Sequence, residues 1–378
     1  MRPKVLVGLC LVLLIAARCT SDGDGPRSPA TRPRALPPKQ AGPFELDHVC
    51  SGLRELEGTQ ISFVSGGKLF VAGRRGSLAR CVARVSRPTD IEWGPQADRL
   101  HFGDLRRYDG GRIASLPGEA QSVAWSRPTG SSIVYVSGGR RDSRGLLMKV
   151  EAFGAEASDI SFLADHDEVV YHPAGTHLAV TGTARDGTYG LWLATNLGEK
   201  RQLLAIGEDA RRIFSLSFSQ DGTRIYYAAE HDHRHEVHSL RLALEDSEGR
   251  IRDAELKTIQ SAPTAMGDVV APLRGSHRIA YSVGPCEEKK MTRVWNGSVV
   301  ELEGRLADQS TEPIGWLPSG ELLVLARADG CSGPGSLYAW QVRADRITRL
   351  ADGVVAAAVR SVLPPPPPPP GSEQEVLA

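Results

Sequence analysis

A short motif that recurs along the chain constrains the fold more than any other feature. Its clearest version is residues 218–229, FSQDGTRIYYAA: an aromatic residue, a polar step, a glycine turn and then an apolar run. Other versions begin at Trp93, Trp125, Tyr171, Ala271 and Trp316. Their spacing of roughly 30–55 residues is typical of proteins built from stacked repeats.

The residues around each motif predict four short β-strands per repeat. The aromatic residue ends a first strand and the run after the glycine forms a second, as in residues 214–218 and 225–227. A polar hairpin then leads to a third strand, such as residues 191–193, and a fourth strand ends in leucine, as at Leu204. Short strands without helical periodicity, in a chain with 40 glycines and 25 prolines, indicate the blades of an all-β propeller.

The motif also supports a family resemblance. An aromatic residue, a polar step, proline and glycine, followed by a Gly-Leu-Trp-Leu third strand at residues 190–193, resembles the TolB-type, WD-like β-propeller repeat. The resemblance covers about residues 58–363 and implies a β-propeller fold. Propellers include enzymes, receptors and scaffolds, so the resemblance implies no particular activity. TolB itself has an extra N-terminal domain where this chain has only a tether, so a role in the Tol system does not follow.

Two strand-like segments remain outside the six versions of the motif. Residues 60–85 precede the first version, and residues 354–360 follow the last. Pairing these segments would complete a seventh blade and join the two ends of the chain, which would leave no open sheet edge. We therefore predict a single β-propeller of seven blades over residues 58–363, with six blades as the alternative.

Residues 1–19 predict export. Arg2 and Lys4 form a charged start, and the apolar run at residues 5–17 is too short for a stable membrane-spanning helix. Cys19 follows small residues, which resembles the lipobox of bacterial lipoproteins and implies lipidation of Cys19. Arg18 stands where that family has Gly or Ala. We expect an extracytoplasmic protein anchored to the membrane through an N-terminal lipid, with secretion as the alternative.

The segments that flank the propeller have the composition of tethers. Residues 20–57 are predicted to form a flexible linker and N-terminal segment, because their Pro-, Ser-, Gly- and Arg-rich first half lacks apolar periodicity. Residues 364–370 are seven consecutive prolines, which favour an extended polyproline helix. Residues 364–378 are therefore predicted to be a polyproline and disordered tail.

Four cysteines lie outside the signal and the lipidation site: Cys50, Cys81, Cys286 and Cys331. An even number in an exported chain favours disulfides. Cys286 and Cys331 fall in corresponding hairpins of consecutive blades, and Cys50 could join the N-terminal segment to the strand that contains Cys81. The hypothesis is therefore two disulfides, 50–81 and 286–331. A four-cysteine metal site needs close paired spacings that this sequence lacks.

Candidates for metal ligands are concentrated in residues 231–238. His231, His233, His235 and His238 lie in this stretch, and in an extended strand the first three would share one side. Imidazoles are good ligands for zinc, copper or nickel. The same hairpin is polar in other blades, however, so a polar loop there needs no metal to explain it.

No catalytic residue and no cofactor is predicted. The sequence contains no Gly-x-Ser-x-Gly elbow, and no pair of carboxylates stands out by its spacing. Asp165 and Asp167 flank His166 in a segment interpreted as a solvated turn. The tryptophans Trp93, Trp125 and Trp316 could suggest sugar stacking, but their shared place in the repeat favours packing between blades.

The function we expect is recognition. The 45 basic and 45 acidic residues cancel, so nothing in the overall charge favours a nucleic-acid partner. We predict a non-enzymatic binding or scaffold module of the cell envelope, whose partner is an envelope protein or extracellular ligand. The loops at residues 140–144, 231–238 and 286–290 are the candidate contact sites. The alternative is a secreted hydrolase or lyase, which would require a cluster of Asp, Glu and His at the channel mouth.

Overall fold

The structure is a computed structural model in which all described residues belong to one compact unit, Ala41–Ala378. It describes residues 43–50, 58–73, 78–86, 91–95, 99–103, 105–108, 112–138, 144–152, 154–199, 202–206, 210–244, 251–273, 275–302, 304–328 and 330–360. The predicted signal and lipidation site, most of the linker and the proline tail lie outside these residues. Within them, no helix is long and apolar enough to cross a membrane. Their only helical turns are two short 3-10 segments, η2 (Gly304–Leu306) and η3 (Val342–Ala344).

Five sheets contain four strands each, hydrogen-bonded in sequence order. Their strands are β5 (Ile91–Trp93), β6 (Leu100–Phe102), β7 (Leu105–Tyr108) and β8 (Arg112–Ser115); β9 (Ala120–Trp125), β10 (Ser132–Ser137), β11 (Leu146–Glu151) and β12 (Ala157–Asp159); β13 (Asp165–Tyr171), β14 (His177–Thr183), β15 (Tyr189–Thr195) and β16 (Gln202–Ile206); β17 (Ala210–Phe218), β18 (Arg224–His231), β19 (His235–Leu244) and β20 (Ile251–Ala262); β21 (Met266–Val270), β22 (Ile279–Val283), β23 (Met291–Trp295) and β24 (Val299–Glu301). Neighbouring strands pair in antiparallel fashion, for example β13 with β14. The predicted four-stranded repeat is therefore present.

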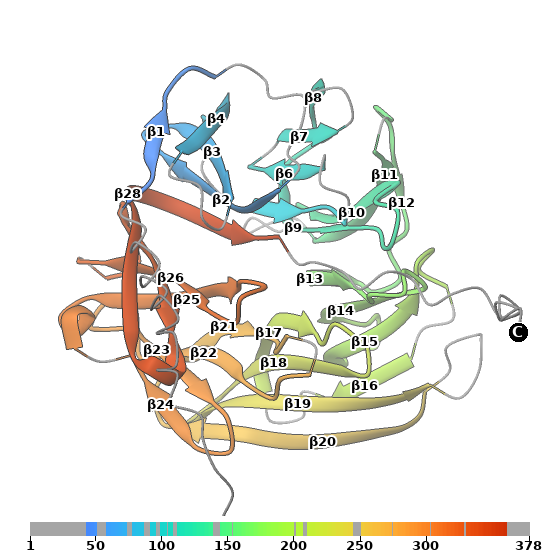
Figure 1. Cartoon of the computed structure of the whole chain (residues 1–378). Helices are drawn as coiled ribbons and strands as arrows, with labels where there is room; N and C mark the ends of the chain where they lie inside the picture. Colours follow the sequence, from blue (N-terminus) through green and yellow to red (C-terminus); the bar gives the residue numbers. More distant parts are fainter. Residues whose placement is uncertain are drawn as a thin grey trace, which may run out of the picture. The chain divides into compact units, whose positions relative to one another are not determined.

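The sixth sheet joins the two ends of the propeller. It has eight strands in the order β1-β4-β3-β2-β28-β27-β26-β25. Their bounds are β1 (Glu45–Asp47), β2 (Thr59–Ser65), β3 (Lys68–Gly73), β4 (Leu78–Arg84), β25 (Ser310–Trp316), β26 (Leu322–Arg327), β27 (Gly335–Gln341) and β28 (Arg346–Val359). The first half of β28 pairs with β27, and its second half pairs with β2 from Ile61↔Val359 to Ser65↔Val354. The predicted pairing of the C-terminal strand with the N-terminal strands is present, and Figure 1 shows β28, in red, meeting the blue strands.

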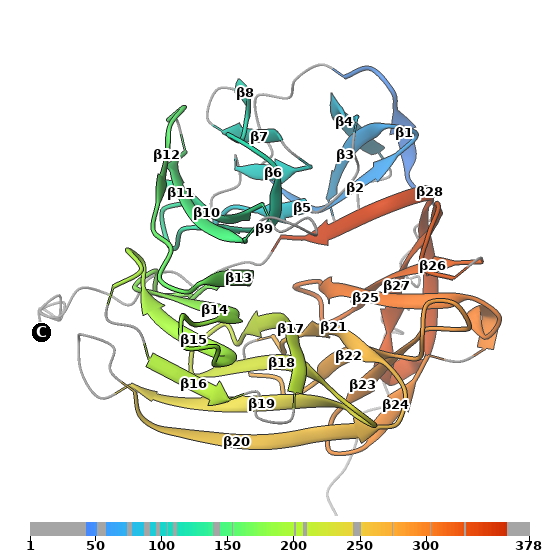
Figure 2. The ribbon, with the colours of Figure 1, turned by 180° about the vertical axis from the view of Figure 1, so that it is seen from behind.

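The sheets are arranged as a propeller. The innermost strands form a closed series of neighbours, β5, β9, β13, β17, β21, β25 and the end of β28, which returns to β5. Figures 1 and 2 show the sheets distributed around this central ring from opposite sides. The predicted all-β propeller fold is confirmed. Hydrogen-bonded sheets number six among the described residues, so a count of seven requires dividing the eight-stranded sheet within β28, and it stays a prediction.

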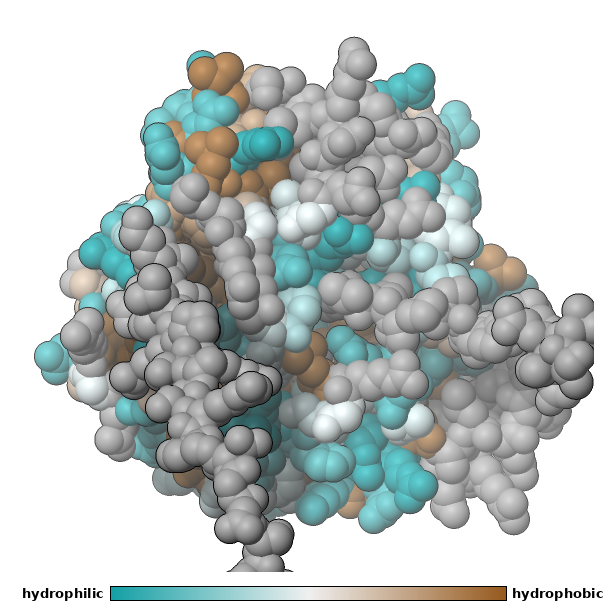
Figure 3. Space-filling view, in the orientation of Figure 1, coloured by the Kyte–Doolittle hydropathy of each residue, from teal (hydrophilic) through white to brown (hydrophobic). Residues whose placement is uncertain are grey.

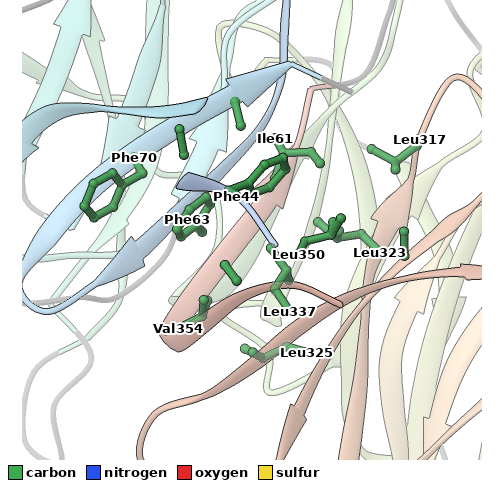
Figure 4. Close-up of a cluster of buried hydrophobic side chains, with 14 of the residues drawn as sticks. Phe44, Ile61, Phe63, Phe70, Leu317, Leu323, Leu325, Leu337, Leu350 and Val354 are labelled. Atoms are coloured by element: carbon green, nitrogen blue, oxygen red, sulfur yellow. The ribbon is translucent and has the colours of Figure 1, made fainter. Parts of the chain in front are cut away.

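The closure is stabilised by a hydrophobic cluster that draws on both ends of the chain. Phe63 and Phe70 from β2 and β3 pack with Leu337 and Val354 from β27 and β28, and Figure 4 shows these side chains in one core. Phe44 joins them, since its ring stacks on Phe63 at 6.0 Å and its backbone N–H donates to the Leu350 carbonyl. Burial of large apolar side chains contributes about 1.5–3 kcal/mol each, so this cluster favours ring closure strongly.

The N-terminal segment therefore contributes to the propeller before residue 58. Strand β1 pairs in parallel with the start of β4, from Glu45↔Leu78 to Asp47↔Arg80. Exposed apolar side chains accompany this edge, with Val49 71% and Leu78 39% exposed. The corresponding face in Figure 3 carries a hydrophobic patch over the β1–β4 strands, in a surface that is otherwise largely hydrophilic where it is coloured.

Both hypothesised disulfides are present. Cys50 is bonded to Cys81 with a Cα–Cα distance of 4.5 Å, which attaches the N-terminal segment to β4. Cys286 is bonded to Cys331 with a Cα–Cα distance of 5.0 Å, which joins the β21–β24 sheet to the loop between β26 and β27. Disulfides persist in oxidising compartments, so the two bonds indicate an extracytoplasmic protein.

The glycine of the repeat motif is explained by contacts between neighbouring blades. Gly222 has φ +72°, and a Cβ there would overlap the ring of His172 from the preceding blade. The Nε2 atom of that histidine lies 3.1 Å from the Gly222 carbonyl oxygen. Gly175 has φ +76°, and a Cβ there would overlap the Arg127 carbonyl. The motif therefore needs glycine for its left-handed turn and for the close approach of one blade to the next.

Candidate functional site: the channel cavity

The inner strands surround a cavity of about 350 Å³. Every inner strand contributes to its wall: residues 91–92, 123–125, 127, 170–171, 173, 216–220, 269–273, 314–316 and 357–359. The wall uses mainly the last residues of each inner strand and the first residues of the turn that follows. The repeat thus places equivalent positions of consecutive blades around one space, where a bound group would contact several blades at once.

Most of the residues that line the cavity are apolar, but polar atoms make up the larger share of its exposed wall. Leu216 and Val359 are among the aliphatic residues of the lining. Trp125 and Trp316 also reach the cavity, yet both are buried, as is Trp93. Their burial agrees with the predicted packing between blades and leaves little ring face for stacking on a sugar.

One ion pair lies in this wall. Among the described lining residues, Glu92 and Arg127 are the charged ones, and their closest O–N distance is 3.8 Å. The Glu92 side chain is 40% exposed, whereas the Arg127 side chain is 14% exposed. Burial lowers the pKa of Arg127, and the charge of Glu92 opposes that shift. Glu92 is therefore the carboxylate that solvent or a ligand in the cavity can reach.

Other polar side chains on the inner strands bind the backbone of the next blade. The Glu168 carboxylate accepts from the Leu216 N–H at 2.8 Å, and the Ser217 hydroxyl accepts from the Ala271 N–H at 3.1 Å. Burial raises the pKa of Glu168 to about 7, although its hydrogen bonds oppose the shift. Leu216 lies in a register shift of the β17–β18 pair and Ala271 follows the end of β21, so both contacts satisfy backbone donors that lack a regular strand partner and stabilise the ring.

His166 is a structural residue rather than part of a solvated turn. It lies in β13 and is buried. The hydrogen-bond network assigns a proton to Nδ1, which donates to the Gly145 carbonyl at 2.8 Å, while Nε2 accepts from the Leu163 N–H at 3.2 Å. Burial lowers its pKa, which favours this neutral form. The interpretation of this stretch as a turn was wrong because the strand begins at Asp165.

The histidine-rich hairpin brings two of the four predicted metal-ligand candidates together. The Nε2 atoms of His231 and His238 lie 3.3 and 3.2 Å from the same carboxylate oxygen of Glu236. His233 is exposed in the turn between β18 and β19. His235 lies on the opposite face of β19, because neighbouring side chains alternate along a strand. Glu236 was not among the predicted ligands, although its two-residue spacing from His238 places both side chains on one face of an extended strand.

The surroundings of this cluster are defined by side chains from the same blade. The second Glu236 oxygen lies 3.1 Å from the Nε of Arg234. The Nδ1 of His238 lies 3.3 Å from the Thr258 hydroxyl oxygen, and the ring of Tyr227 lies 5.0 Å from the His238 ring. Burial lowers the pKa of His238, and the Glu236 charge opposes this shift.

The predicted contact loops lie away from the cavity. Inner and second strands are antiparallel, so a hairpin between second and third strands lies at the end where the inner strand begins. Residues 231–238 and 286–290 are such hairpins, and none of them lines the cavity. In the second loop, Lys290 pairs with Asp268 at 2.7 Å. Residues 140–143 lie outside the described residues, and Arg144 is exposed.

Comparison with known proteins supports the fold alone. No protein-family model matches the chain, and no curated protein sequence matches it. Among solved structures, the chain is similar to the periplasmic gluconolactonase of Pseudomonas aeruginosa, with TM-score 0.51 and 15% identity over 80% of this chain and 99% of that one. It is similar to an oligogalacturonate lyase in complex with manganese, with TM-score 0.51 and 13% identity over 68% and 79% of the two chains. TolB from Acinetobacter baumannii gives TM-score 0.47 and 14% identity over 63% and 61%.

These similarities agree with the β-propeller defined by the strand pairing. At such identities they indicate no activity, since unrelated functions share this fold. The TolB-type repeat remains a resemblance of the sequence.

Proposed function

We propose that this protein is an exported β-propeller that acts as a non-enzymatic binding module of the cell envelope. The observation that carries the proposal is the composition of the channel wall. Its described lining combines apolar side chains from all inner strands with the polar residues Ser217, Ser219 and Gln220 and one ion pair, Glu92 and Arg127. Such a wall can hold a group of mixed polar and apolar character from an envelope protein or extracellular ligand, and the exposed carboxylate can orient it.

The recognition mechanism relies on a preformed cavity. Contacts such as Glu168 with Leu216 fix the inner strands relative to one another, so little ordering is required when a partner binds. The apolar part of the wall contributes binding free energy through the apolar area that it removes from water, and its polar part offers hydrogen bonds. Glu92 favours partners with a hydrogen-bond donor or a positive charge beside their apolar group. The proposal includes no cofactor and no nucleic-acid partner.

We further propose that the protein is tethered to the membrane through lipidated Cys19, with free secretion as the alternative. The two disulfides support the extracytoplasmic side of this proposal. Intact mass spectrometry of membrane and supernatant fractions tests the anchor. A membrane form that begins at Cys19 with added acyl mass supports it, whereas an unmodified form in the supernatant overturns it.

The alternative function is a secreted hydrolase or lyase whose site lies at the channel mouth. The partly exposed Glu92 favours this alternative, because a carboxylate beside a buried guanidinium can move a proton while Arg127 stabilises developing negative charge. The lactonase and lyase structures show that propellers can be enzymes, but their likeness to this chain is one of fold.

A site-specific photo-crosslinking experiment separates binding from catalysis. A photoreactive amino acid at Gln220, which lines the cavity, is compared with one at Leu256, which is exposed on β20. If the cavity binds a partner, a distinct crosslinked product should form from Gln220 only. The purified partner must then bind the isolated protein in calorimetry. Products that are identical from both positions would overturn the cavity as the binding site.

If the protein is such an enzyme, the purified protein should turn over sugar lactones or acidic oligosaccharides. That turnover must fall at least about 100-fold in Glu92→Gln if this carboxylate transfers the proton. Turnover with this dependence would replace the binding proposal.

A further inference from the structure

Three potential ligand atoms converge at the tip of the β18–β19 hairpin. The Nε2 atoms of His231 and His238 lie 3.3 and 3.2 Å from Oε2 of Glu236, and all three atoms lie within 4.8 Å of one another. In a tetrahedral zinc site with bonds of about 2.0–2.1 Å, neighbouring ligand atoms are about 3.3 Å apart. Both Nε2–Oε2 distances match that edge length, and the two Nε2 atoms lie within 4.8 Å of one another.

The local backbone accounts for this convergence. Glu236 and His238 are two residues apart in β19 and therefore project from the same face. The turn from β18 is tight, with the His231 N–H donating to the Arg234 carbonyl at 2.8 Å, and it places His231 beside them. A rigid hairpin thus supplies all three groups, which favours a preformed arrangement.

A further contact orients the more buried histidine. His238 Nδ1 lies 3.3 Å from the Thr258 hydroxyl oxygen on the adjacent strand β20. A proton on Nδ1 that is donated to this hydroxyl leaves the Nε2 lone pair directed at the cluster. Metal-binding histidines commonly have such an outer partner, which fixes the tautomer and the ring orientation.

The charges around the cluster leave one carboxylate oxygen for a cation. Arg234 contacts Oε1 of Glu236, so Oε2 is the oxygen that faces both imidazoles. Arg234 is itself 56% exposed and can move away. Side-chain exposures of 14% for His231, 13% for Glu236 and 7% for His238 give a site that is mostly enclosed and still reachable from solvent.

We propose that His231, Glu236 and His238 bind one divalent transition-metal ion, with zinc as the preferred ion. Two imidazoles and a carboxylate suit zinc, and three protein ligands leave a fourth position for water or for a side chain of a partner. The site lies at the other end of the blade from the channel cavity. It therefore neither requires nor replaces the proposed function.

The competing explanation is a metal-free network in which both Nε2–H groups donate to Glu236. The two explanations differ in what Glu236→Gln does. A glutamine retains a hydrogen-bond acceptor but loses the charge that a metal requires.

The test is isothermal titration calorimetry of the full chain with zinc chloride, after treatment with a chelator. Wild type is compared with Glu236→Gln and His231→Gln, and His233→Gln is the matched control because His233 is exposed in the same hairpin. We expect one equivalent of zinc in the wild type and in the control. Loss of a direct ligand should weaken binding by more than the 10–100-fold typical of outer-partner loss, and Thr258→Val should weaken it about 10-fold.

A second readout reports on the geometry and is independent of stability. Cobalt(II) added in place of zinc should give the intense visible absorption of a four-coordinate ion in wild type and His233→Gln, and lose it in Glu236→Gln. Circular dichroism of each variant establishes that the propeller is folded. The proposal is overturned if wild type binds no zinc, if Glu236→Gln and His231→Gln bind as wild type does, or if His233→Gln loses as much affinity as they do.

Discussion

The channel cavity and the β18–β19 hairpin use polar side chains in opposite ways. On the inner strands, Glu168 and Ser217 accept hydrogen bonds from backbone N–H groups of the neighbouring blade, so they stabilise the ring. In the hairpin, His231, Glu236 and His238 contact one another, and solvent can reach the group. In the first region these polar groups stabilise the ring, and in the second they are grouped where solvent can reach them.

This difference shows where each kind of function can arise on the same scaffold. The cavity wall is built from equivalent positions of several blades, where buried backbone groups need hydrogen-bond partners. Polar side chains in the wall must therefore first satisfy these backbone groups. A hairpin tip carries no such requirement, so its side chains can converge on one point. The following predictions test whether the two regions are as distinct as their contacts indicate.

The largest effect is expected at the inter-blade turn near the cavity. Gly222→Ala places a Cβ against His172 and forces an alanine into a left-handed conformation. We expect a loss of at least about 2 kcal/mol in the free energy of unfolding, measured by urea denaturation.

Gly187→Ala is the matched control for this substitution. Gly187 has φ +87° and no heavy atom within 4 Å of its Cβ position, so it should lose only about 1 kcal/mol for the conformation. Equal losses in the two variants would contradict a contribution from contact between blades.

The next largest effect is expected in the pH dependence of the free energy of unfolding, and it arises from a histidine buried within a blade. Burial lowers the pKa of His101 to about 4, from 6.5 when exposed, and nearby Arg106 adds to the shift. The unfolded chain therefore binds a proton before the folded protein does, and stability falls as pH drops below 6.5 and continues to fall to about 4.

From pH 7 to pH 5 this single group should cost about 2 kcal/mol of the free energy of unfolding. The measurement is urea denaturation at both pH values for wild type and His101→Gln. The raised pKa of Glu168 acts in the opposite direction but is common to both proteins, so the difference isolates His101. Parallel pH profiles for the two proteins would refute the assignment.

A smaller effect is expected from the ion pair in the cavity. Glu92→Gln removes the negative charge that lies beside the mostly buried Arg127 guanidinium. Because the pair is 3.8 Å apart and Glu92 is 40% exposed, we expect a loss of about 1 kcal/mol or less in thermal or urea denaturation. Binding of a cationic partner should weaken much more than stability does. A stability loss of several kcal/mol would instead make the pair a structural element of the ring.

The smallest effect on stability is expected at the hairpin. Arg234→Gln removes the ion pair between the exposed Arg234 and the mostly buried Glu236, and because Arg234 is screened by solvent it should change the free energy of unfolding by less than about 0.5 kcal/mol. If the hairpin binds zinc, the same variant should bind it a few-fold more tightly, because a competing positive charge is gone. Weaker zinc binding would show that Arg234 supports the site, and unchanged binding would show that its charge does not compete with the metal.

The fold could be predicted from repeated local patterns, whereas contacts between distant segments could not be predicted. The aromatic-and-glycine motif identified the ends of β13 and β17, and the leftover residues 354–360 indicated the closing strand. Nothing in the local pattern of Phe44 shows that it stacks on Phe63, because that contact depends on the assembled closure. The predicted alternation of His231, His233 and His235 failed since a turn separates β18 from β19.

The closure by β28 also has a consequence for the order of events in folding. Strand β2 receives its inner neighbour from residues nearly at the far end of the described chain, as in the bond from the Ser65 hydroxyl to the Asp352 carbonyl across 287 positions. Loop-closure entropy grows slowly with length, so this separation costs little in final stability, yet long-range contacts slow folding. During synthesis, the edge of β2 therefore stays unpaired until β28 has been made. An unpaired strand edge can pair with another molecule, so we expect the chain to be most prone to aggregation in that interval.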